Sequence, residues 1–377
     1  MDKLFLLDAY ALIYRSYYAF IKAPRINSKG LNTSCIMGFC NTLNEILTKE
    51  KPTHIAVAFD HGKTFRHEAF PAYKAQREET PEDIKLSVPI IKNILEAYNI
   101  PILQVDGFEA DDIIGTVAIQ AGEKGIETYM LTPDKDYGQL VRENVYMFRP
   151  RHGGGYETLG EKEIEEKYGI ASPLQVIDLL ALMGDSADNF PGCPGVGEKT
   201  AAKLINEFGS VENLIENSSK VKGKLREKVE GAIEDIKISK FLATIRTDVP
   251  VEIKMDDLKL VEPDKEKLDE IFSELEFKSF ANRILKKPQQ NKIKPTGELD
   301  LFGAQQDDGQ EVQKNASFET LKSTPHEYQL IENEEDAKKL YDYLMTFDTL
   351  SLDTETTSTN AIDAELVGLS FSIEEGK

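Results

Sequence analysis

HIAVAFD, residues 54–60, is a short apolar segment that ends in an acid. The same pattern occurs in LFLLD at residues 4–8, and a third apolar segment, ETYMLTPD, spans residues 127–134. Segments of helical length lie between them, such as residues 89–98 and 110–120. Short apolar strands that alternate with helices are typical of a parallel sheet covered on both faces. The sequence therefore predicts an α/β fold with a mostly parallel central sheet flanked by helices.

Acids gather at the ends of these strands and in short motifs. The carboxyl ends of parallel strands meet at one edge of a sheet, where ligand sites form. Asp8, Asp60 and Asp134 fall at these ends, and the segment EADD at residues 109–112 opens the next helix. The complete set of nine acids comprises Asp8, Asp60, Glu109, Asp111, Asp112, Asp134, Asp136, Asp185 and Asp188.

Each acid taken alone is typical of a helix cap or a turn, and that role stays open for any one of them. The nine together would repel one another unless cations lay between them. Hard oxygen ligands suit Mg²⁺ or Mn²⁺, and the sequence has no cluster of Cys and His for zinc. Two such ions about 4 Å apart would support the in-line displacement of a phosphodiester. We therefore expect a two-metal hydrolase site.

Five motifs, in the order in which they occur, resemble the 5′-nuclease domain of bacterial DNA polymerase I, which is grouped with the flap endonucleases. They cover residues 1–285 and read LFLLDAYALIYRSYYAF, AVAFDHGKTFRHEAFPAYKAQR, DGFEADDIIGTVA, LTPDKDYGQL and LMGDSADNFPGCPGVGEKTAAKLI. The resemblance implies a structure-specific 5′–3′ exonuclease and flap endonuclease that removes RNA primers and flaps in DNA replication and repair. It also implies that the acids from Asp8 to Asp112 hold or orient one metal ion, and that those from Asp134 to Asp188 complete a second site.

Basic residues follow the second strand. They lie in KTFRHE at residues 63–68 and in YKAQR at residues 73–77, and a solvated helical face of mixed charge is their ordinary interpretation. In the resembled family the matching segment, about residues 63–90 here, forms an arch over the active site. A cation beside the scissile phosphate would stabilise charge in the transition state. By the resemblance, the candidates for this catalytic role are Lys74, Arg77 and Arg66.

GCPGVGEKTAAK, residues 192–203, is a helix–hairpin–helix motif. Its glycines let the backbone approach a phosphate, and the following helix presents free N–H groups. Such contacts ignore base identity and suit structure-specific binding. By the resemblance, this hairpin also holds a K⁺ ion. The residues expected to contact DNA are Tyr14, Arg15, Gly195, Gly197, Lys199, Thr200 and Lys203. A further basic run follows the hairpin in sequence. It could extend the surface that binds duplex DNA or form a solvated face, and the sequence leaves both interpretations open for Lys220, Lys222, Lys224, Arg226 and Lys228.

The motifs divide the chain into four parts. We expect a catalytic core at residues 1–172, a helical helix–hairpin–helix subdomain at 173–285, a flexible linker at 286–325 and an incomplete segment at 326–377. The linker contains ELDLF, Glu298 to Phe302, which resembles peptides that dock on bacterial sliding clamps, although a chance apolar cluster is the alternative.

The last segment contains SLDTET at residues 351–356, which resembles the first motif of a proofreading 3′–5′ exonuclease of RNase H-like fold. By this resemblance Asp353 and Glu355 would be vestigial metal ligands. The sequence looks truncated relative to the family, and one helix with two strands cannot bury a sufficient core. We therefore expect this segment to be loosely ordered and inactive.

Bulk properties add weaker expectations. A formal net charge of −21 argues against a simple basic nucleic-acid binder, but residues 291–377 alone hold 19 acidic and 7 basic side chains. With no membrane-length apolar segment and no signal peptide, we expect a cytoplasmic monomer that associates with the nucleoid through DNA. Cys35, Cys40 and Cys193 form no metal-ligand or redox pattern and are expected to be reduced and structural.

Two other functions fit parts of the pattern. A PIN-type metal-dependent ribonuclease shares the acidic cleft, but the helix–hairpin–helix motif and the arch-like basic segment argue against it. A non-catalytic DNA-junction binder would explain the DNA-binding motifs, but it has little reason to keep all nine acids.

Overall fold

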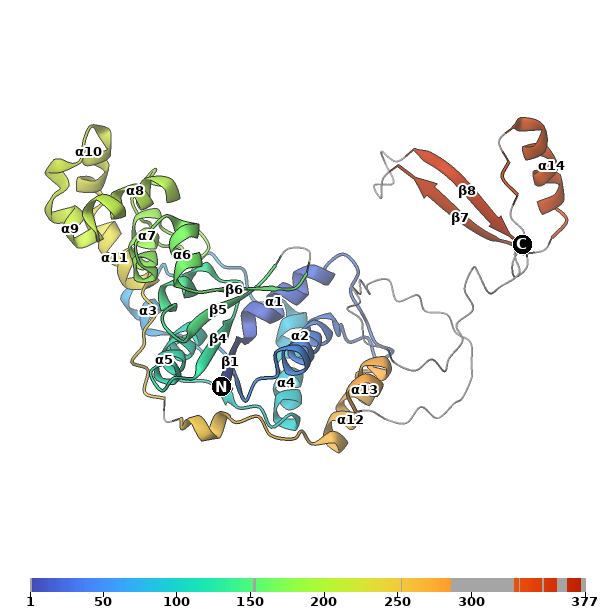
Figure 1. Cartoon of the computed structure of the whole chain (residues 1–377), viewed down its shortest axis with the longest axis horizontal. Coiled ribbons are helices and arrows are strands. Elements are labelled where there is room, and N and C mark those ends of the chain that lie inside the picture. Colours follow the sequence, from blue (N-terminus) through green and yellow to red (C-terminus); the bar gives the residue numbers. More distant parts are fainter. Residues whose placement is uncertain are drawn as a thin grey trace. The chain divides into compact units, whose positions relative to one another are not determined.

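The computed structural model describes residues 2–151, 154–251, 253–285, 329–331, 333–347, 349–357 and 365–373 (Figure 1). The chain divides into two compact units, Met1–Lys292 and Ile293–Lys377. The expected linker and its ELDLF peptide lie outside the described residues, so both stay predictions.

The first unit is built on a six-stranded sheet with the strand order β3-β2-β1-β4-β5-β6. All neighbouring strands are parallel except β5 and β6, which are antiparallel. This arrangement confirms the predicted mostly parallel sheet. The strands are β1 (Lys3–Asp8), β2 (His54–Ala58), β3 (Ile102–Leu103), β4 (Glu127–Leu131), β5 (Val145–Pro150) and β6 (Tyr156–Leu159).

Helices cover both faces of the sheet because the central strand β1 is apolar on both sides. Leu4 and Leu6 pack with α5 (Ala110–Gly122) in one apolar cluster. Phe5 and Leu7 point to the opposite face and pack in a second cluster. The helices of that second face are α1 (Ala9–Phe20), α2 (Ser34–Glu45) and α4 (Glu82–Ala97) (Figure 1).

Helix α4 differs from the expected segment at residues 89–98, because it begins at Glu82 and contains Pro89 in its interior. Glu82 and Asp83 favour the earlier start, since acids in the first turn complement the helix dipole. The buried stripe that includes Ile84 and Ile91 continues on both sides of the proline.

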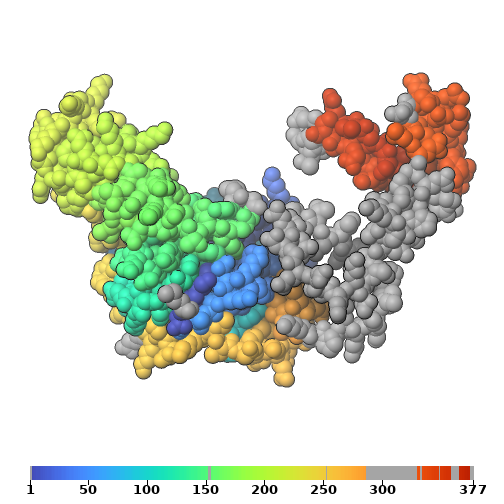
Figure 2. Space-filling view, in the orientation of Figure 1, coloured from blue at the N-terminus to red at the C-terminus, as the bar shows by residue number. Residues whose placement is uncertain are grey.

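Helices of the expected helical segment divide into two groups. The first group continues the chain beyond the sheet and forms a lobe beside the α/β core, coloured green to yellow (Figures 1 and 2). The second group packs instead against α4 on the sheet, where Phe272 and Phe280 share the cluster of Phe5. The first group is α7 (Val176–Met183), α8 (Glu198–Phe208), α9 (Val211–Glu216), α10 (Lys224–Gly231) and α11 (Ile233–Ala243), and the second is α12 (Lys265–Glu274) and α13 (Lys278–Leu285). We call α7–α11 the helical lobe.

Short helices complete the first unit. They are the α-helices α3 (Phe65–Ala69) and α6 (Glu161–Tyr168), the π-helical turn η1 (Ile46–Glu50), and the 3₁₀ helices η2 (Lys135–Leu140), η3 (Pro173–Gln175), η4 (Ser218–Lys220) and η5 (Met255–Leu258). All three cysteines are buried as free thiols, which confirms that prediction. No helix among the described residues is long and apolar enough to cross a membrane.

The second unit contains the expected helix and two strands. Helix α14 (Glu334–Leu344) is capped by the Asn333 side chain, which accepts a hydrogen bond from the Asp336 N–H at 2.9 Å. Strands β7 (Ser351–Thr356) and β8 (Leu366–Ser372) form an antiparallel hairpin. Asp353 and Glu355 are exposed on one face of β7, and no residue described in this unit is buried.

Candidate active site

The first two acids lie where neighbouring strands end. Asp8 ends β1 and caps α1, since its Oδ1 accepts the Ala11 N–H at 3.1 Å. Its Oδ2 accepts the Tyr137 hydroxyl at 3.1 Å. Asp60 follows β2, and its Oδ1 accepts the Ala110 N–H at 2.7 Å. Asp60 therefore joins the strand edge to the start of α5.

Three further acids surround the first turn of α5. Glu109 is the N-cap residue, and its own N–H donates to Asp112 Oδ2 at 3.1 Å. Asp112 is completely buried and Glu109 is nearly so, whereas Asp111 is partly exposed. This turn places the three side chains at the same edge of the sheet as Asp60.

Asp134 and Asp136 follow β4 in the next loop. Asp134 caps η2, because its Oδ1 accepts the Asp136 N–H at 3.0 Å. Asp136 Oδ1 is buried and has no hydrogen-bond partner within the described part of the chain. A buried carboxylate oxygen without a donor is unfavourable unless a cation satisfies it.

Asp185 and Asp188 lie in a tight loop after α7. Backbone bonds of 3.1 Å in both directions between Asp185 and Phe190 close this loop. Gly184 and Gly192 have φ values of 69° and 61°, and their backbones pack so closely that a Cβ at Gly192 would lie 2.2 Å from the Gly184 nitrogen. Both glycines are therefore required where the loop closes.

Basic side chains from the expected arch reach into this cluster. Lys74 Nζ lies 2.7 Å from Glu109 Oε1 and 3.8 Å from Asp188 Oδ2, and Arg77 pairs with Asp188. The backbone also docks here, since the Lys74 N–H donates to the Asp188 carbonyl at 3.0 Å. The structure thus brings Lys74 and Arg77 together with the carboxylates.

Three residues that the sequence did not single out also belong to this cluster. Lys135 pairs with Asp185 at 2.8 Å. The Tyr73 hydroxyl donates to Glu109 Oε2 at 2.9 Å and to Asp188 Oδ2 at 3.2 Å, and Tyr137 binds Asp8. Each is adjacent in sequence to a predicted site residue, and this adjacency was the only sequence feature that could have identified them.

Electrostatics of the acids reflect burial and mutual repulsion. Burial, followed by repulsion from Asp60, raises the pKa of Asp8 to about 7. Burial likewise raises the pKa values of Asp60, Asp111, Asp134 and Asp136, with neighbouring acids adding to each shift. For Glu109 the pKa is lowered instead, because Lys74 and Arg66 outweigh burial. Negative charge in this cluster therefore exceeds what the nearby cations neutralise.

These properties fit divalent cations. The donors are carboxylate oxygens, which Mg²⁺ and Mn²⁺ prefer, and Asp136 offers an oxygen without a partner. Within the described residues, no three Asp, Glu, His or Cys side chains form a ready cage for a metal ion. Lys74, Arg77 and Lys135 are paired with Glu109, Asp188 and Asp185 instead. Ion binding would thus exchange these internal pairs for metal–oxygen contacts.

Arg66 does not lie where the sequence prediction placed it. Its side chain is 1% exposed and points away from solvent. Both terminal nitrogens bind Asp112, at 2.7 and 2.8 Å, and Nη1 also donates to Glu109 Oε2 at 3.2 Å. A guanidinium held in this way is engaged by Asp112 and Glu109, and this geometry favours a positioning role for Arg66 over the predicted contact with a phosphate.

Asp112 is affected by the same pairing. Oδ1 also accepts the Arg246 N–H at 2.7 Å, and Oδ2 accepts the Glu109 N–H. Each oxygen therefore already accepts two hydrogen bonds, from protein donors in a buried site. This geometry favours an orienting role for Asp112 over direct metal binding.

DNA-binding candidates lie mostly on exposed surfaces. Gly195 has a φ of 74°, and Gly197 caps α8, which places its first N–H groups at the hairpin. Lys199 and Lys203 are exposed on α8, and Thr200 is half-buried there. The Lys228 ammonium lies so near Gly195 that a side chain at 195 would collide with it. The remaining basic run, Lys220, Lys222, Lys224 and Arg226, is exposed nearby in the chain.

Tyr14 and Arg15 lie on α1, the helix that Asp8 caps. The Tyr14 ring stacks on Tyr18, with a centroid distance of 6.3 Å, and its hydroxyl donates to Thr80 Oγ1 at 3.4 Å. Arg15 is exposed. The predicted contacts of Tyr14 and Arg15 with DNA stay predictions.

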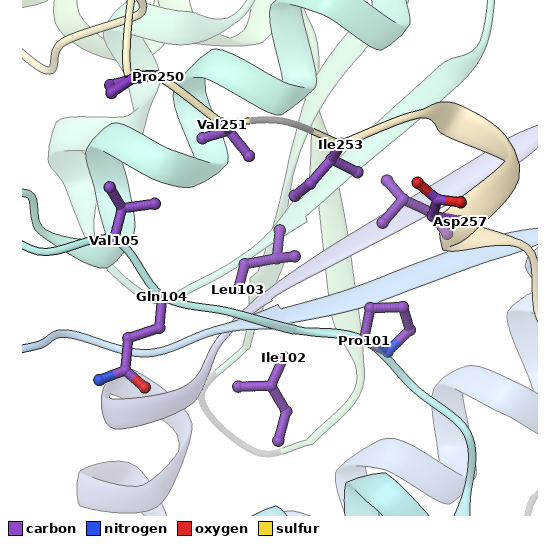
Figure 3. A pocket seen from close by; sticks show the side chains of 10 residues that line it. Pro101, Ile102, Leu103, Gln104, Val105, Pro250, Val251, Ile253 and Asp257 are labelled. Carbon is purple, nitrogen blue, oxygen red and sulfur yellow. The ribbon is translucent and has the colours of Figure 1, made fainter.

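A hollow of about 330 Å³ lies elsewhere, between β3 and the chain that follows the helical lobe (Figure 3). Its lining is mainly apolar, including Ile102, Leu103, Val251 and Ile253. None of the nine acids lines it. The hollow is therefore distinct from the carboxylate cluster.

The fold and its carboxylate edge define a nuclease of the 5′-nuclease type. Residues 3–169 match the N-terminal resolvase-like domain of 5′-3′ exonucleases, and residues 171–266 match the C-terminal SAM fold of these enzymes. A 5′-3′ exonuclease of Aquifex aeolicus is 38% identical over 285 residues, which are 75% of this chain and 96% of that protein. The chain belongs to the 5′-3′ exonuclease family.

Longer relatives match the same part of the chain, and solved structures share its fold. DNA polymerase I of Bacillus caldotenax is 42% identical over 301 residues, which are 79% of this chain but 34% of the relative, so the chain spans about a third of that protein. A bacteriophage T5 flap endonuclease, solved in a complex with DNA and metal ions, shares the fold with a TM-score of 0.53 and 21% identity. The match covers 73% of this chain and 100% of that structure.

Proposed function

We propose that the chain hydrolyses DNA phosphodiesters at the junction of a 5′ single strand with a duplex, as a 5′–3′ exonuclease and flap endonuclease. The observation that supports this most is the set of carboxyl groups gathered at one edge of the sheet, whose pKa values are raised together by desolvation and by repulsion from neighbouring acids. A family member with such a cluster is suited to divalent-metal chemistry on phosphodiesters.

Mg²⁺ or Mn²⁺ is the ion that we propose for this cluster. When bound, two such ions would lower the pKa of an attacking water and stabilise the leaving oxygen. Asp112 would orient Glu109 without binding an ion, because its oxygens are engaged by Arg66 and Arg246. The proposed ligands of one ion are Asp8, Asp60, Glu109 and Asp111, and those of the second are Asp134, Asp136, Asp185 and Asp188.

Lys74 and Arg77 supply the positive charge for the phosphate. In the structure Lys74 pairs with Glu109, and Arg77 pairs with Asp188. If Glu109 and Asp188 served as metal ligands, the ammonium of Lys74 and the guanidinium of Arg77 would be available to a phosphate oxygen at the same place. A preorganised cation there stabilises the charge that develops in the transition state.

Substrate choice would come from the helical lobe. The hairpin at Gly195 to Gly197 and the exposed Lys199 and Lys203 offer backbone and ammonium groups to one duplex strand, with K⁺ as the proposed ion of the hairpin. Since the matched polymerases are much longer, we propose that the longer protein uses this activity to remove RNA primers and flaps in replication and repair.

Cleavage of a 5′-labelled double-flap DNA tests this function. We expect cutting near the junction with Mg²⁺, lost with EDTA and in Asp134→Asn, and kept in Asp235→Asn, which changes an exposed acid on α11. Binding without cutting in Mg²⁺ and in Mn²⁺ would favour a non-catalytic junction binder. Equal cutting of unstructured RNA would favour a PIN-type ribonuclease.

A further inference from the structure

Residues 242–249, which we call the return strap, comprise the last two residues of α11 and the segment that leads from it back to the core. Side chains of the core bind successive backbone groups of this strap. Arg66 Nε donates to the Leu242 carbonyl and Nη2 to the Thr244 carbonyl, both at 2.9 Å. Gln139 donates to the Ala243 carbonyl and accepts the Ile245 N–H, both at 2.9 Å.

Two more buried side chains extend the same pattern. Asp112 Oδ1 accepts the Arg246 N–H at 2.7 Å, and Thr116 Oγ1 accepts the Val249 N–H at 3.2 Å. All four side chains that hold the strap are at most 3% exposed. Burial of polar groups is unfavourable unless their hydrogen bonds are made, so these side chains tolerate only a narrow range of strap positions.

The groups that hold the strap are also bound to the carboxylate cluster. Arg66 donates to Glu109 at 3.2 Å, and the Gln139 side-chain amide donates to the Asp136 carbonyl at 3.0 Å. Asp112 accepts the N–H of Glu109. A displacement of the strap would therefore be transmitted through one hydrogen bond to Glu109 and to the loop of Asp136.

We propose that Arg66 and Gln139 are positioning residues that set which phosphodiester is cut. The chain enters the helical lobe at α7 and leaves it through the strap, and lobe and core also share one apolar cluster. Because the strap is the connection held by buried polar side chains, it contributes to the distance between the DNA-binding hairpin and the acids. A shift of one nucleotide along a strand is several ångströms, and a lobe that can move by that amount would present neighbouring phosphodiesters to the cluster. This inference rests on the proposed nuclease function.

Gln139 gives the sharpest test because it carries no charge and is not a proposed metal ligand. Gln139→Leu removes both strap bonds, together with the bond to the Asp136 carbonyl that links the strap to the cluster, while keeping a similar volume. Gln175→Leu is the matched control, since Gln175 also joins two backbone groups, accepting the Ala171 N–H at 2.9 Å and donating to the Gly209 carbonyl at 2.8 Å. Gln175 is outside the strap and the cluster.

In single-turnover cleavage of the 5′-labelled flap, wild type and Gln175→Leu should give the same main product. Gln139→Leu should spread cutting over adjacent phosphodiesters, while the summed rate changes less than about tenfold. Arg66→Lys keeps the charge but loses the planar guanidinium, whose nitrogens bind the strap carbonyls and Asp112 at the same time. This variant should distribute cutting over more phosphodiesters than Gln139→Leu. An unchanged product pattern with a lower rate would overturn the proposal, because it would indicate only a structural role.

A second measurement does not depend on cleavage. Spin labels at Lys124→Cys, exposed after α5, and Glu207→Cys, exposed on α8, report the distance between core and lobe. We expect a broader distance distribution in Gln139→Leu than in wild type or Gln175→Leu. An identical distribution would overturn the proposal even if the wild type cut no flap, whereas broadening without cleavage would reject the proposed function alone.

Discussion

Asp8 is the residue at which pH acts most directly on this site. Burial, with repulsion from Asp60 and Asp134, raises its pKa from 3.8 to about 7. Between these values the unfolded chain releases the proton while the folded chain keeps it. The free energy of unfolding of the metal-free protein should therefore fall as pH rises through this window, by at most about 1.4 kcal/mol per pH unit from this group.

Thermal unfolding in EDTA from pH 4 to pH 8 measures this effect. We expect the stability of Asp8→Asn to decline less over this range than that of the wild type, because the amide does not titrate. Equal declines in both proteins would show that Asp8 ionises normally.

Lys74 acts on the same acids through charge rather than protonation. Its ammonium competes with divalent ions for Glu109, 2.7 Å away, yet it is also the proposed phosphate contact. Lys74→Met should therefore bind Mn²⁺ at least as tightly as the wild type in calorimetric titration, and cut flap DNA about 100-fold more slowly. Lys85→Met is the control, since Lys85 pairs with Glu79 outside the cluster. Weaker Mn²⁺ binding in Lys74→Met would contradict this role.

At the scale of elements, the loop after α7 depends on its closing glycines. Ala at Gly192 would place a Cβ 2.2 Å from the Gly184 nitrogen and would adopt an unfavourable positive φ. We expect a loss of about 2–5 kcal/mol in the free energy of unfolding. Gly209 also has a positive φ of 83°, but a Cβ there would meet no atom within 4 Å. The free energy of unfolding of Gly209→Ala should therefore fall by about 1–2 kcal/mol only. Urea unfolding of both variants checks the difference, and equal losses would remove the argument from close packing.

Helix α8 should contribute to DNA binding through single charges. If Lys199 and Lys203 each contact one phosphate, changing either to Ala should lower duplex affinity and reduce the slope of log affinity against log salt by about one. Fluorescence anisotropy in EDTA, over a series of KCl concentrations, measures this slope. Lys237→Ala is the control, because Lys237 pairs with Glu234 on α11 at 2.8 Å. A slope unchanged in both α8 variants would place the hairpin away from the duplex.

The sequence predicted elements better than it predicted contacts between them. Strands β1 and β2 could be predicted because each contains a short continuous apolar run, and β4 because its apolar residues Tyr129 to Leu131 precede a Pro-Asp turn. The acids at their ends follow from parallel pairing. Arg66 could not be placed, because a basic residue in a short helix carries no signal of whether it faces solvent or a buried Asp112. The return strap was also invisible, since its hydrogen bonds involve backbone groups about 100 residues or more from Gln139 and Arg66 in sequence.

At the scale of the whole molecule, the two units differ in what stabilises them. Both apolar clusters draw their buried residues from the first unit, with Leu4 as the first and Ala281 as the last. In the second unit, Leu352, Leu366 and Val367 are more than half exposed. Within the described residues, the apolar clusters that stabilise the first unit are therefore built from its own side chains.

A chain that ends at Leu285 should consequently keep the unfolding temperature of the first unit. Residues 286–377 hold 19 acidic and 9 basic side chains, so the shorter chain has a formal net charge of −11 instead of −21. Less repulsion from DNA should lower KM several-fold at low salt with kcat unchanged, and the difference should shrink as salt screens the charges. Steady-state flap cleavage at two salt concentrations, beside thermal unfolding, checks both expectations. A large loss of kcat or of unfolding temperature would instead show that residues beyond Leu285 support the catalytic unit.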